Sequence, residues 1–216
     1  DLVQSKRESA RNELADKMDT DFWASSQATN GVAGIRLAFP TDPTTTTNYQ
    51  GINGSTNTWW RNKTNVTGGV ASTAMLGIWD IIDQAIRTEG LDYDVIFTTF
   101  NLDRIYRQIG RTYGSWIMNP PAGAKKALDL GIGTANFNGK PVVPDQSCPV
   151  GFSYFVNTRA TKLVKDPEAY MSMDGDGFVP LTGNSQYGKE ALMHARWAFV
   201  TNQRRANAQA SGFTES

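Results

Sequence analysis

The broadest apolar pattern in the chain lies at residues 71–89, where it predicts a helix. Its apolar side chains recur at intervals of three and four residues, and they are Ala74, Met75, Ile78, Trp79, Ile82, Ala85 and Ile86. This spacing places them on one wide helical face, and Gly90 follows as a stop signal. A face of this width predicts burial on more than one side.

A narrower apolar stripe runs through residues 1–24. Its members recur every four residues and are Ala10, Leu14, Met18 and Phe22. Charged side chains cover the other faces, among them Lys6, Arg7, Glu8, Arg11, Glu13, Asp16 and Lys17. The pattern predicts a long surface helix that packs along one side only.

Residues 91–110 combine a strand pattern with a helix pattern. Asp94 precedes a short β-prone run at residues 95–97, and Asn101 is placed to cap the helix that follows. Intervals of three and four residues place one apolar group on the same face of that helix, namely Leu102, Ile105, Tyr106 and Ile109. Gly110 is suited to end the helix. We therefore expect a strand that leads into a helix through a tight connection.

A hairpin and a further strand follow. Asn138-Gly139 is a strong turn signal between Phe137 and the run that starts at Pro141, and residues 152–156 form another strand pattern. Pro141 and Pro144 cannot donate ladder hydrogen bonds. We therefore expect this hairpin edge to be protected or to lie against a neighbour.

Long stretches of the chain lack regular periodicity. Residues 31–69 are rich in Gly, Asn and Thr and predict loops and short strands, which include Trp59-Trp60-Arg61-Asn62. Two adjacent Trp residues on a strand would point to opposite faces. Glycine and proline in residues 111–136 predict a mobile or ligand-facing loop, and strands are expected again at residues 191–201.

Read as an ordered set, these residues resemble the tailed-phage major capsid protein family, the Hong Kong 97 type of coat fold. The matching pieces are the Asp-strand-helix unit with Tyr106, then Phe137-x-Gly139-x-Pro141-Val142-Val143-x-Asp145, then Pro149-x-Gly151-x-x-Tyr154-Phe155-x-Asn157. The resemblance implies an α+β fold with a long spine helix, a peripheral sheet and an apical α/β lobe. Residues 1–70 would hold the spine helix and peripheral segments, residues 71–190 the apical domain, and residues 191–216 the return strands.

The resemblance also implies a function. The chain would be a structural protein that assembles into hexamers and pentamers of an icosahedral shell around phage double-stranded DNA. It would need no catalytic residue and no cofactor, and its further partners would be scaffolding, portal or decoration proteins. Assembly would take place in the host cytoplasm. Family members carry an arm and a hairpin loop near the spine helix, so we expect further sequence before Asp1.

Ten residues are candidates for bracing or contacting subunits under this interpretation. Trp59, Trp60, Arg61 and Asn62 would brace the central sheet. Phe137, Gly139 and Pro141 would shape the apical hairpin beside Tyr106. Arg204 and Arg205 would make contacts between subunits or toward the inside of the shell.

Composition narrows the alternatives. The 216 residues include 21 Lys and Arg and 21 Asp and Glu, so the formal net charge is zero. A sequence-wide basic field that would attract nucleic acid is excluded, and any DNA contact must be local. The single Cys148 excludes an internal disulfide, and neither a signal peptide nor a long apolar span is evident. These features favour synthesis in an intracellular, reducing compartment without a membrane partner.

No catalytic constellation is apparent in the sequence. His194 has no nucleophile motif to serve, Cys148 has no basic cluster beside it, and one Cys with one His cannot form a standard zinc site. Asp174 and Asp176 fall short of a full calcium loop, and Gly131-Ile132-Gly133 falls short of a dinucleotide loop. Two alternatives remain: an encapsulin-like compartment shell, and a carbohydrate-binding or hydrolytic β-rich module that uses the Trp pair and the Asp174–Asp176 loop.

Overall fold

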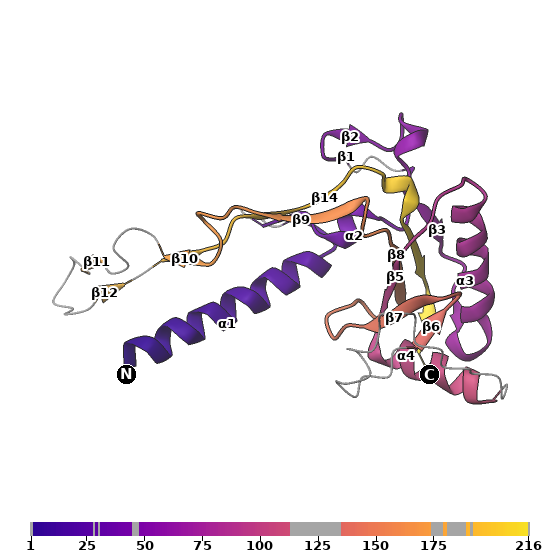
Figure 1. The fold of residues 1–216 in the computed structure, drawn as a ribbon, viewed down its shortest axis with the longest axis horizontal. Coiled ribbons are helices and arrows are strands. Elements are labelled where there is room, and N and C mark those ends of the chain that lie inside the picture. The colour runs from indigo at the N-terminus through magenta and orange to yellow at the C-terminus, as the bar shows by residue number, and fades with distance from the viewer. Residues whose placement is uncertain are drawn as a thin grey trace.

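The computed structural model describes residues 2–27, 29, 31–44, 48–112, 135–173, 179–180, 189–190 and 192–215. It has two parts (Figure 1). We call the first the body: a six-stranded sheet with the helices α3 (Ala71–Arg87) and α4 (Phe100–Thr112). The second is the arm: the helix α1 (Leu2–Trp23) and the two-stranded ribbon of β9 (Thr161–Lys165) and β14 (Trp197–Thr201).

The strands of the body come from distant parts of the chain. In spatial order they are β3 (Lys63–Asn65), β15 (Ala208–Ser211), β8 (Phe152–Val156), β5 (Val95–Thr98), β7 (Lys140–Pro144) and β6 (Ala135–Phe137). The β3–β15 and β5–β7 pairs are parallel and the other three are antiparallel. Strands from all three predicted segments thus share one sheet, and the division at residues 70 and 190 stays a prediction.

Both faces of this sheet are buried, each in its own cluster. Alternation along β5 sends Ile96 to the face covered by α3 and α4, and it sends Val95 to the opposite face. The first cluster centres on Trp79, whose ring lies 5.1 Å from that of Tyr106 and 5.3 Å from that of Phe137. The second contains the end of α1 and the short helix α2 (Ile35–Ala38). Both core clusters are therefore formed by residues of the same chain.

Short elements complete the structure. They are β1 (Asn48–Tyr49), β2 (Ile52–Asn53), the 3₁₀ helices η1 (Thr58–Trp60) and η2 (Arg204–Ala206), and the pairs β4 (Gly69–Val70) with β16 (Phe213–Thr214), β10 (Ser172–Met173) with β13 (Met193–His194), and β11 (Val179–Pro180) with β12 (Lys189–Glu190). Across the described ranges no helix has both the length and the apolar character that a membrane crossing requires.

Most predicted elements are confirmed. The helices at residues 1–24 and 71–89 are α1 and α3, and Gly90 follows α3 with a φ of 70°. The hairpin turn has positive φ at both Asn138 (48°) and Gly139 (80°), as a two-residue turn with the strand twist requires. Residues 152–156 form β8. The predicted loop at residues 111–136 falls largely outside the described residues.

Two details of the predicted α4 helix are wrong. The α4 helix begins at Phe100 rather than after Asn101, because Thr99 caps it: its Oγ1 accepts a hydrogen bond from Leu102 N at 3.1 Å. Gly110 lies inside α4, which runs to Thr112. The hairpin edge with Pro141 and Pro144 is protected as expected, because β7 lies between β6 and β5 in the sheet.

Candidate functional site

Among the described parts of the chain, the arm has little cover from other elements, as the helix α1 shows. Ala10, Leu14 and Met18 of its predicted stripe are only half-buried, and full burial begins at Trp23. The Trp23 ring lies 5.5 Å from that of Tyr154 in the body. The helix is thus anchored at its C-terminal end, while its remaining turns extend beside the ribbon (Figure 1).

The β9–β14 ribbon is covered over only part of one face, where Phe199 packs against Phe22 of α1 and Phe39, which follows α2. Leu163 and Val164 are neighbours in β9 and point to opposite faces, yet each is 50% exposed. Leu163 pairs with Phe199, whose ring packs 5.2 Å from that of Phe22 in α1. Among the described strands, none pairs with either outer edge of the ribbon. Exposed apolar side chains on an unpaired ribbon make it a candidate surface for another protein segment.

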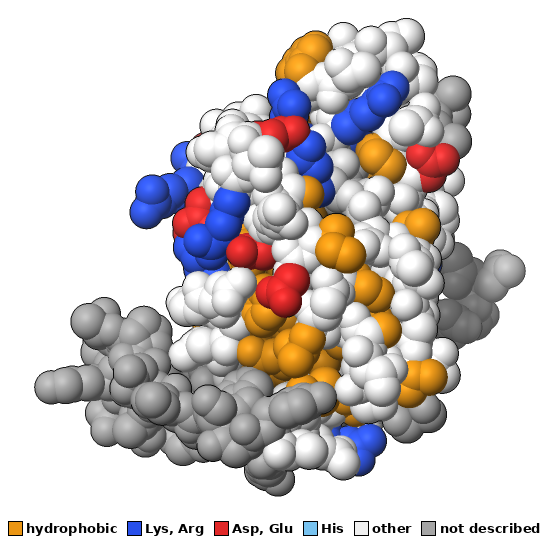
Figure 2. Space-filling view, turned by 90° about the vertical axis from the view of Figure 1, so that its right-hand side faces the viewer, with side chains coloured by type: hydrophobic (Ala, Val, Ile, Leu, Met, Phe, Trp, Pro, Cys, Tyr) orange, Lys and Arg blue, Asp and Glu red, His pale blue; other side chains and the backbone are white. Residues whose placement is uncertain are grey.

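The body also has an exposed contact surface, along the outer side of α3. An open groove of about 370 Å³ lies there, lined by Lys63, Ile81, Gln84, Ala85, Thr88 and Glu89. Figure 2 looks at this side of the molecule and shows apolar side chains low on the face, with most charged ones above them. Ile81 is exposed although it belongs to α3. The groove is a second candidate surface for contacts.

The predicted bracing group at residues 59–62 is placed differently from the expectation. Trp59 and Trp60 lie in the 3₁₀ helix η1 rather than in a strand, although one is 56% exposed and the other 4% exposed. Arg61 contacts an earlier part of its own loop, where its Nε donates a hydrogen bond to Gly54 O at 2.8 Å. Asn62 is buried and donates to Pro40 O at 3.2 Å. The group ties its own loop together, and its bracing of the sheet stays a prediction.

The apical candidates divide between core and surface. Tyr106 and Phe137 are buried in the first cluster, and Tyr106 donates its hydroxyl proton to Asn136 O at 2.7 Å. Gly139 is exposed in the hairpin turn, and Pro141 is half-buried opposite Asn136. Only the hairpin tip is therefore open to a neighbouring molecule, and its role as a contact stays a prediction.

Arg204 and Arg205 have opposite environments. Arg204 is 1% exposed, donates from Nε to Ala38 O, and lies 5.8 Å from the ring centre of Tyr49. Burial lowers the pKa of Arg204 to about 10. Arg205 is partly exposed and forms an ion pair with Glu89, from Nε to Oε2 at 2.6 Å. Arg204 is thus an interior residue, and neither contact was evident from the sequence.

Glu89 joins the end of α3 to two other segments. Lys63 of β3 and Arg205 of η2 both pair with it. Burial opposes ionisation, but the hydrogen bonds from Lys63 and Arg205 outweigh it and hold the pKa of Glu89 below its usual value. The cluster is an electrostatic clasp at the edge of the body.

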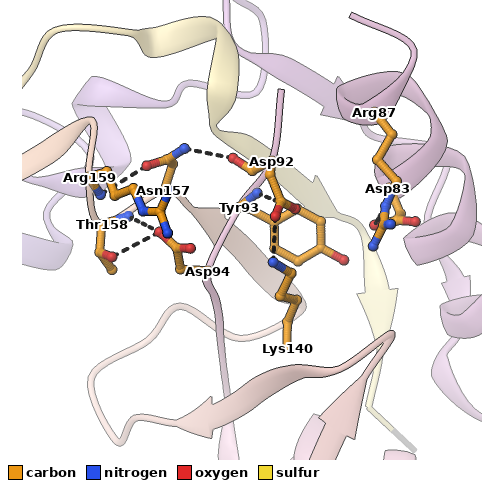
Figure 3. A network of polar contacts seen from close by, with 9 residues as sticks. All are labelled: Asp83, Arg87, Asp92, Tyr93, Asp94, Lys140, Asn157, Thr158 and Arg159. Atoms are coloured by element: carbon orange, nitrogen blue, oxygen red, sulfur yellow. Dashed lines mark hydrogen bonds and ion pairs between the residues drawn. The ribbon is translucent and has the colours of Figure 1, made fainter. Parts of the chain in front are cut away.

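A second polar network lies where the body meets the arm (Figure 3). Lys140 Nζ is 2.6 Å from Asp92 Oδ2, and Asn157 Nδ2 donates to Asp92 O at 2.7 Å. Asp94 Oδ2 accepts hydrogen bonds from Thr158 N at 3.0 Å and Thr158 Oγ1 at 2.9 Å. Two members of this network, Asp94 and Asn157, belong to the sequence pattern of the capsid family. The sequence did not show that the two segments that carry them lie side by side.

The residues considered for chemistry are not assembled into a reaction centre. Burial raises the pKa of the Cys148 thiol, and nearby Asp145 and Glu215 raise it further, so the reactive thiolate is disfavoured. His194 pairs with the Ser172 hydroxyl at 3.2 Å. Within the described residues no group of three His, Cys, Asp or Glu could hold a metal ion, and the Asp174–Asp176 loop and the Gly131–Gly133 loop lie outside them.

The fold is similar to that of solved capsid subunits. A chain of the cyanophage A-1(L) capsid asymmetric unit aligns with a TM-score of 0.72 and 21% identity, over 99% of this chain and 69% of that chain. A native gene transfer agent capsid aligns at 0.49 and 12% identity, over 95% and 65%. An encapsulin complex of Synechococcus elongatus aligns at 0.46 and 10% identity, over 71% and 53%.

No protein-family model and no curated protein matches the chain. The cyanophage alignment confirms the predicted fold, the α+β architecture of a phage major capsid protein.

Proposed function

We propose that the chain is the structural subunit of a phage capsid and that many copies assemble into an icosahedral shell around double-stranded DNA. The observation that carries this proposal is the alignment with the cyanophage A-1(L) capsid over 99% of the chain. The similarity is not confined to one lobe, since it includes both body and arm. The role is structural and involves no catalytic step.

The difference in packing between the two parts supports assembly. The body buries one cluster of its own and shares a second with the base of the arm, whereas farther out the arm leaves Leu163, Val164 and most of α1 only partly covered. A surface of this kind gains free energy when another copy covers it. Symmetric repetition of modest contacts then stabilises a closed shell.

Hexamers and pentamers of the chain are the assembly units that this function requires. Scaffolding, portal and decoration proteins are further partners in the proposal, and the assembly takes place in the host cytoplasm. Because the formal net charge is zero, the chain as a whole supplies no basic field, and in this proposal the packaged DNA is held by the closed shell and by local contacts.

Electron microscopy and sedimentation of the protein expressed from its complete reading frame test the proposal. We expect closed shells or capsomer rings that sediment far ahead of the single subunit. A protein that stays dispersed as monomers at micromolar concentration contradicts it. Nuclease-protected DNA inside native particles supports the phage capsid, whereas protein cargo without DNA supports the encapsulin-like compartment.

The structure does not offer the pair of exposed Trp rings that the carbohydrate-binding alternative requires. Such a module would present both Trp59 and Trp60 to a sugar, but Trp60 is buried in the second cluster. A thermal shift series with oligosaccharides checks this point, and we expect no change in melting temperature. A saturable rise with a sugar would favour the alternative.

A further inference from the structure

The two strands that form the ribbon are continuations of two strands of the sheet. Strand β8 leads into β9, and β14 leads into β15. Inside the body β15 pairs with β8, and the last pair there is Ala208 with Phe155. In the arm β14 pairs with β9, and the first pair is Thr201 with Thr161. One antiparallel ladder is therefore interrupted between body and arm, and the arm leaves the body at this interruption.

An interrupted ladder leaves backbone groups without their usual hydrogen-bond partners. The side chain of Asn207 provides hydrogen bonds to several groups at this interruption. Its side chain is fully buried, and its Oδ1 accepts hydrogen bonds from Asn157 N at 2.8 Å and Thr161 Oγ1 at 3.3 Å. Its Nδ2 donates to Gln203 O at 3.0 Å. One amide thus connects both strands of the ladder across the gap, which requires a donor and an acceptor in one side chain.

Asn157 and Asp94 hold the outer side of the same gap (Figure 3). Asn157 Oδ1 accepts hydrogen bonds from Arg159 N and Ala160 N, both at 2.9 Å. Its Nδ2 donates to Asp92 O, which belongs to the segment before β5. Asp94 binds Thr158 through both its backbone N and its hydroxyl. The connection at residues 157–160 is therefore fixed to the body by side chains rather than by a ladder.

We propose that Asn207, with Asn157 and Asp94, forms a joint that sets the direction of the arm relative to the body and thereby the curvature of the shell. The second part of this inference rests on the proposed function, whereas the first concerns the single chain. Side-chain bonds at an interrupted ladder fix one direction, whereas a ladder without them bends over a range of directions.

Distance measurements on the dispersed chain test the joint. Spin labels on cysteines at two exposed positions, Ala198→Cys in β14 and Gln84→Cys in α3, report the arm and the body. Cys148 is buried and has a raised thiol pKa, so it stays unlabelled. We expect Asn207→Ala to give a distance distribution about twice as wide as that of the parent. An unchanged distribution in a folded Asn207→Ala chain overturns the proposal.

Two further variants keep the test decisive. Asn65→Ala is the matched control, because Asn65 Oδ1 makes the same kind of bond, to Thr67 N at 3.0 Å, outside the joint. We expect the control to leave the distances unchanged. If Asn207→Ala does not fold, Asp94→Ala decides by the same criterion, since Asp94 holds an exposed part of the connection.

The assembly readout separates this inference from the proposed function. We expect shells of Asn207→Ala to vary in diameter or to fail to close. Shells of the parent diameter from a chain with a widened distance distribution contradict the link to curvature and leave the capsid function intact. A parent chain that never assembles contradicts the capsid function, while the distances still decide whether the joint exists.

Discussion

The body and the arm show two ways of using apolar residues. In the body Trp79 is fully buried and in contact with three aromatic rings of the same chain. In the arm Leu163 and Val164 lie in a regular ribbon but remain half-exposed. Secondary structure thus forms in both regions, whereas tertiary burial is completed in only one. The difference indicates that most of the fold's internal burial lies in the body, and under the proposed function the exposed part of the arm is covered by neighbouring copies.

The largest effect should come from emptying the core of the body. We expect Trp79→Ala to lower the free energy of unfolding by about 3 to 5 kcal/mol, because it removes a large buried ring from the first cluster. Chemical denaturation of the dispersed chain measures this loss.

Ile81→Ala is the matched control on the same helix, since Ile81 is exposed. We expect it to stay within about 0.5 kcal/mol of the parent. Equal losses for the two variants would contradict the division between a buried and an exposed side of α3.

An intermediate effect should come from the Glu89 clasp, and it should depend on pH. The folded-state pKa of Glu89 lies below its ordinary value of 4.5, so the clasp contributes fully above that pH and is lost as pH falls through the folded pKa. We expect Glu89→Gln to cost about 1 to 2 kcal/mol at neutral pH. The cost should vanish in acid, which unfolding curves measured from pH 7 to pH 3 would show.

Asp166→Asn is the corresponding control in the arm. Its ion pair with Arg196 is long, at 3.9 Å, and Arg196 is largely exposed. Since exposed pairs contribute little, we expect Asp166→Asn to stay within about 0.5 kcal/mol of the parent at neutral pH. A loss as large as that of Glu89→Gln would show that the arm, too, is held by its own charges.

The smallest effect on the single chain should come from the open ribbon face. We expect Val164→Glu to change the free energy of unfolding by less than about 1 kcal/mol, since the side chain is exposed and the strand is retained. Shell formation measured by sedimentation should nevertheless fall by at least about tenfold, because a charge would enter an apolar contact.

Val164→Thr is the control, because it keeps the shape of the side chain and adds no charge. We expect it to assemble at a level close to that of the parent. Normal shells from Val164→Glu would place the contacts of the arm elsewhere.

Local patterns predicted the elements that depend on nearby residues. The apolar face of α3 and the Asn138-Gly139 turn follow from spacing and from backbone preference, and both are present as expected. The start of α4 was misjudged because Thr99 and Asn101 are both good capping residues, and only the path of the chain decides between them. The Trp pair was expected in a strand because two adjacent residues in a strand point to opposite faces. One turn of 3₁₀ helix also buries one of two adjacent residues and exposes the other, so the sequence does not distinguish the two structures.

Long-range arrangement was beyond the reach of these patterns. The parallel pairing of β3 with β15 joins residues that lie far apart in the sequence, and neither strand is long enough to have a strong pattern of its own. Arg204 has a charge that normally indicates the surface, yet it is buried against Ala38 and Tyr49. The Asn207 joint depends on the ends of two ladders meeting, which no single segment reveals.

The position of β15 has a consequence for synthesis of the protein on the ribosome. This strand lies between β3 and β8, so the sheet is divided until residues 208–211 have emerged. The α3 helix and β5 are synthesised much earlier, and until β15 is made the sheet beside them lacks this strand. The order of translation therefore delays completion of the sheet until these four residues have been made.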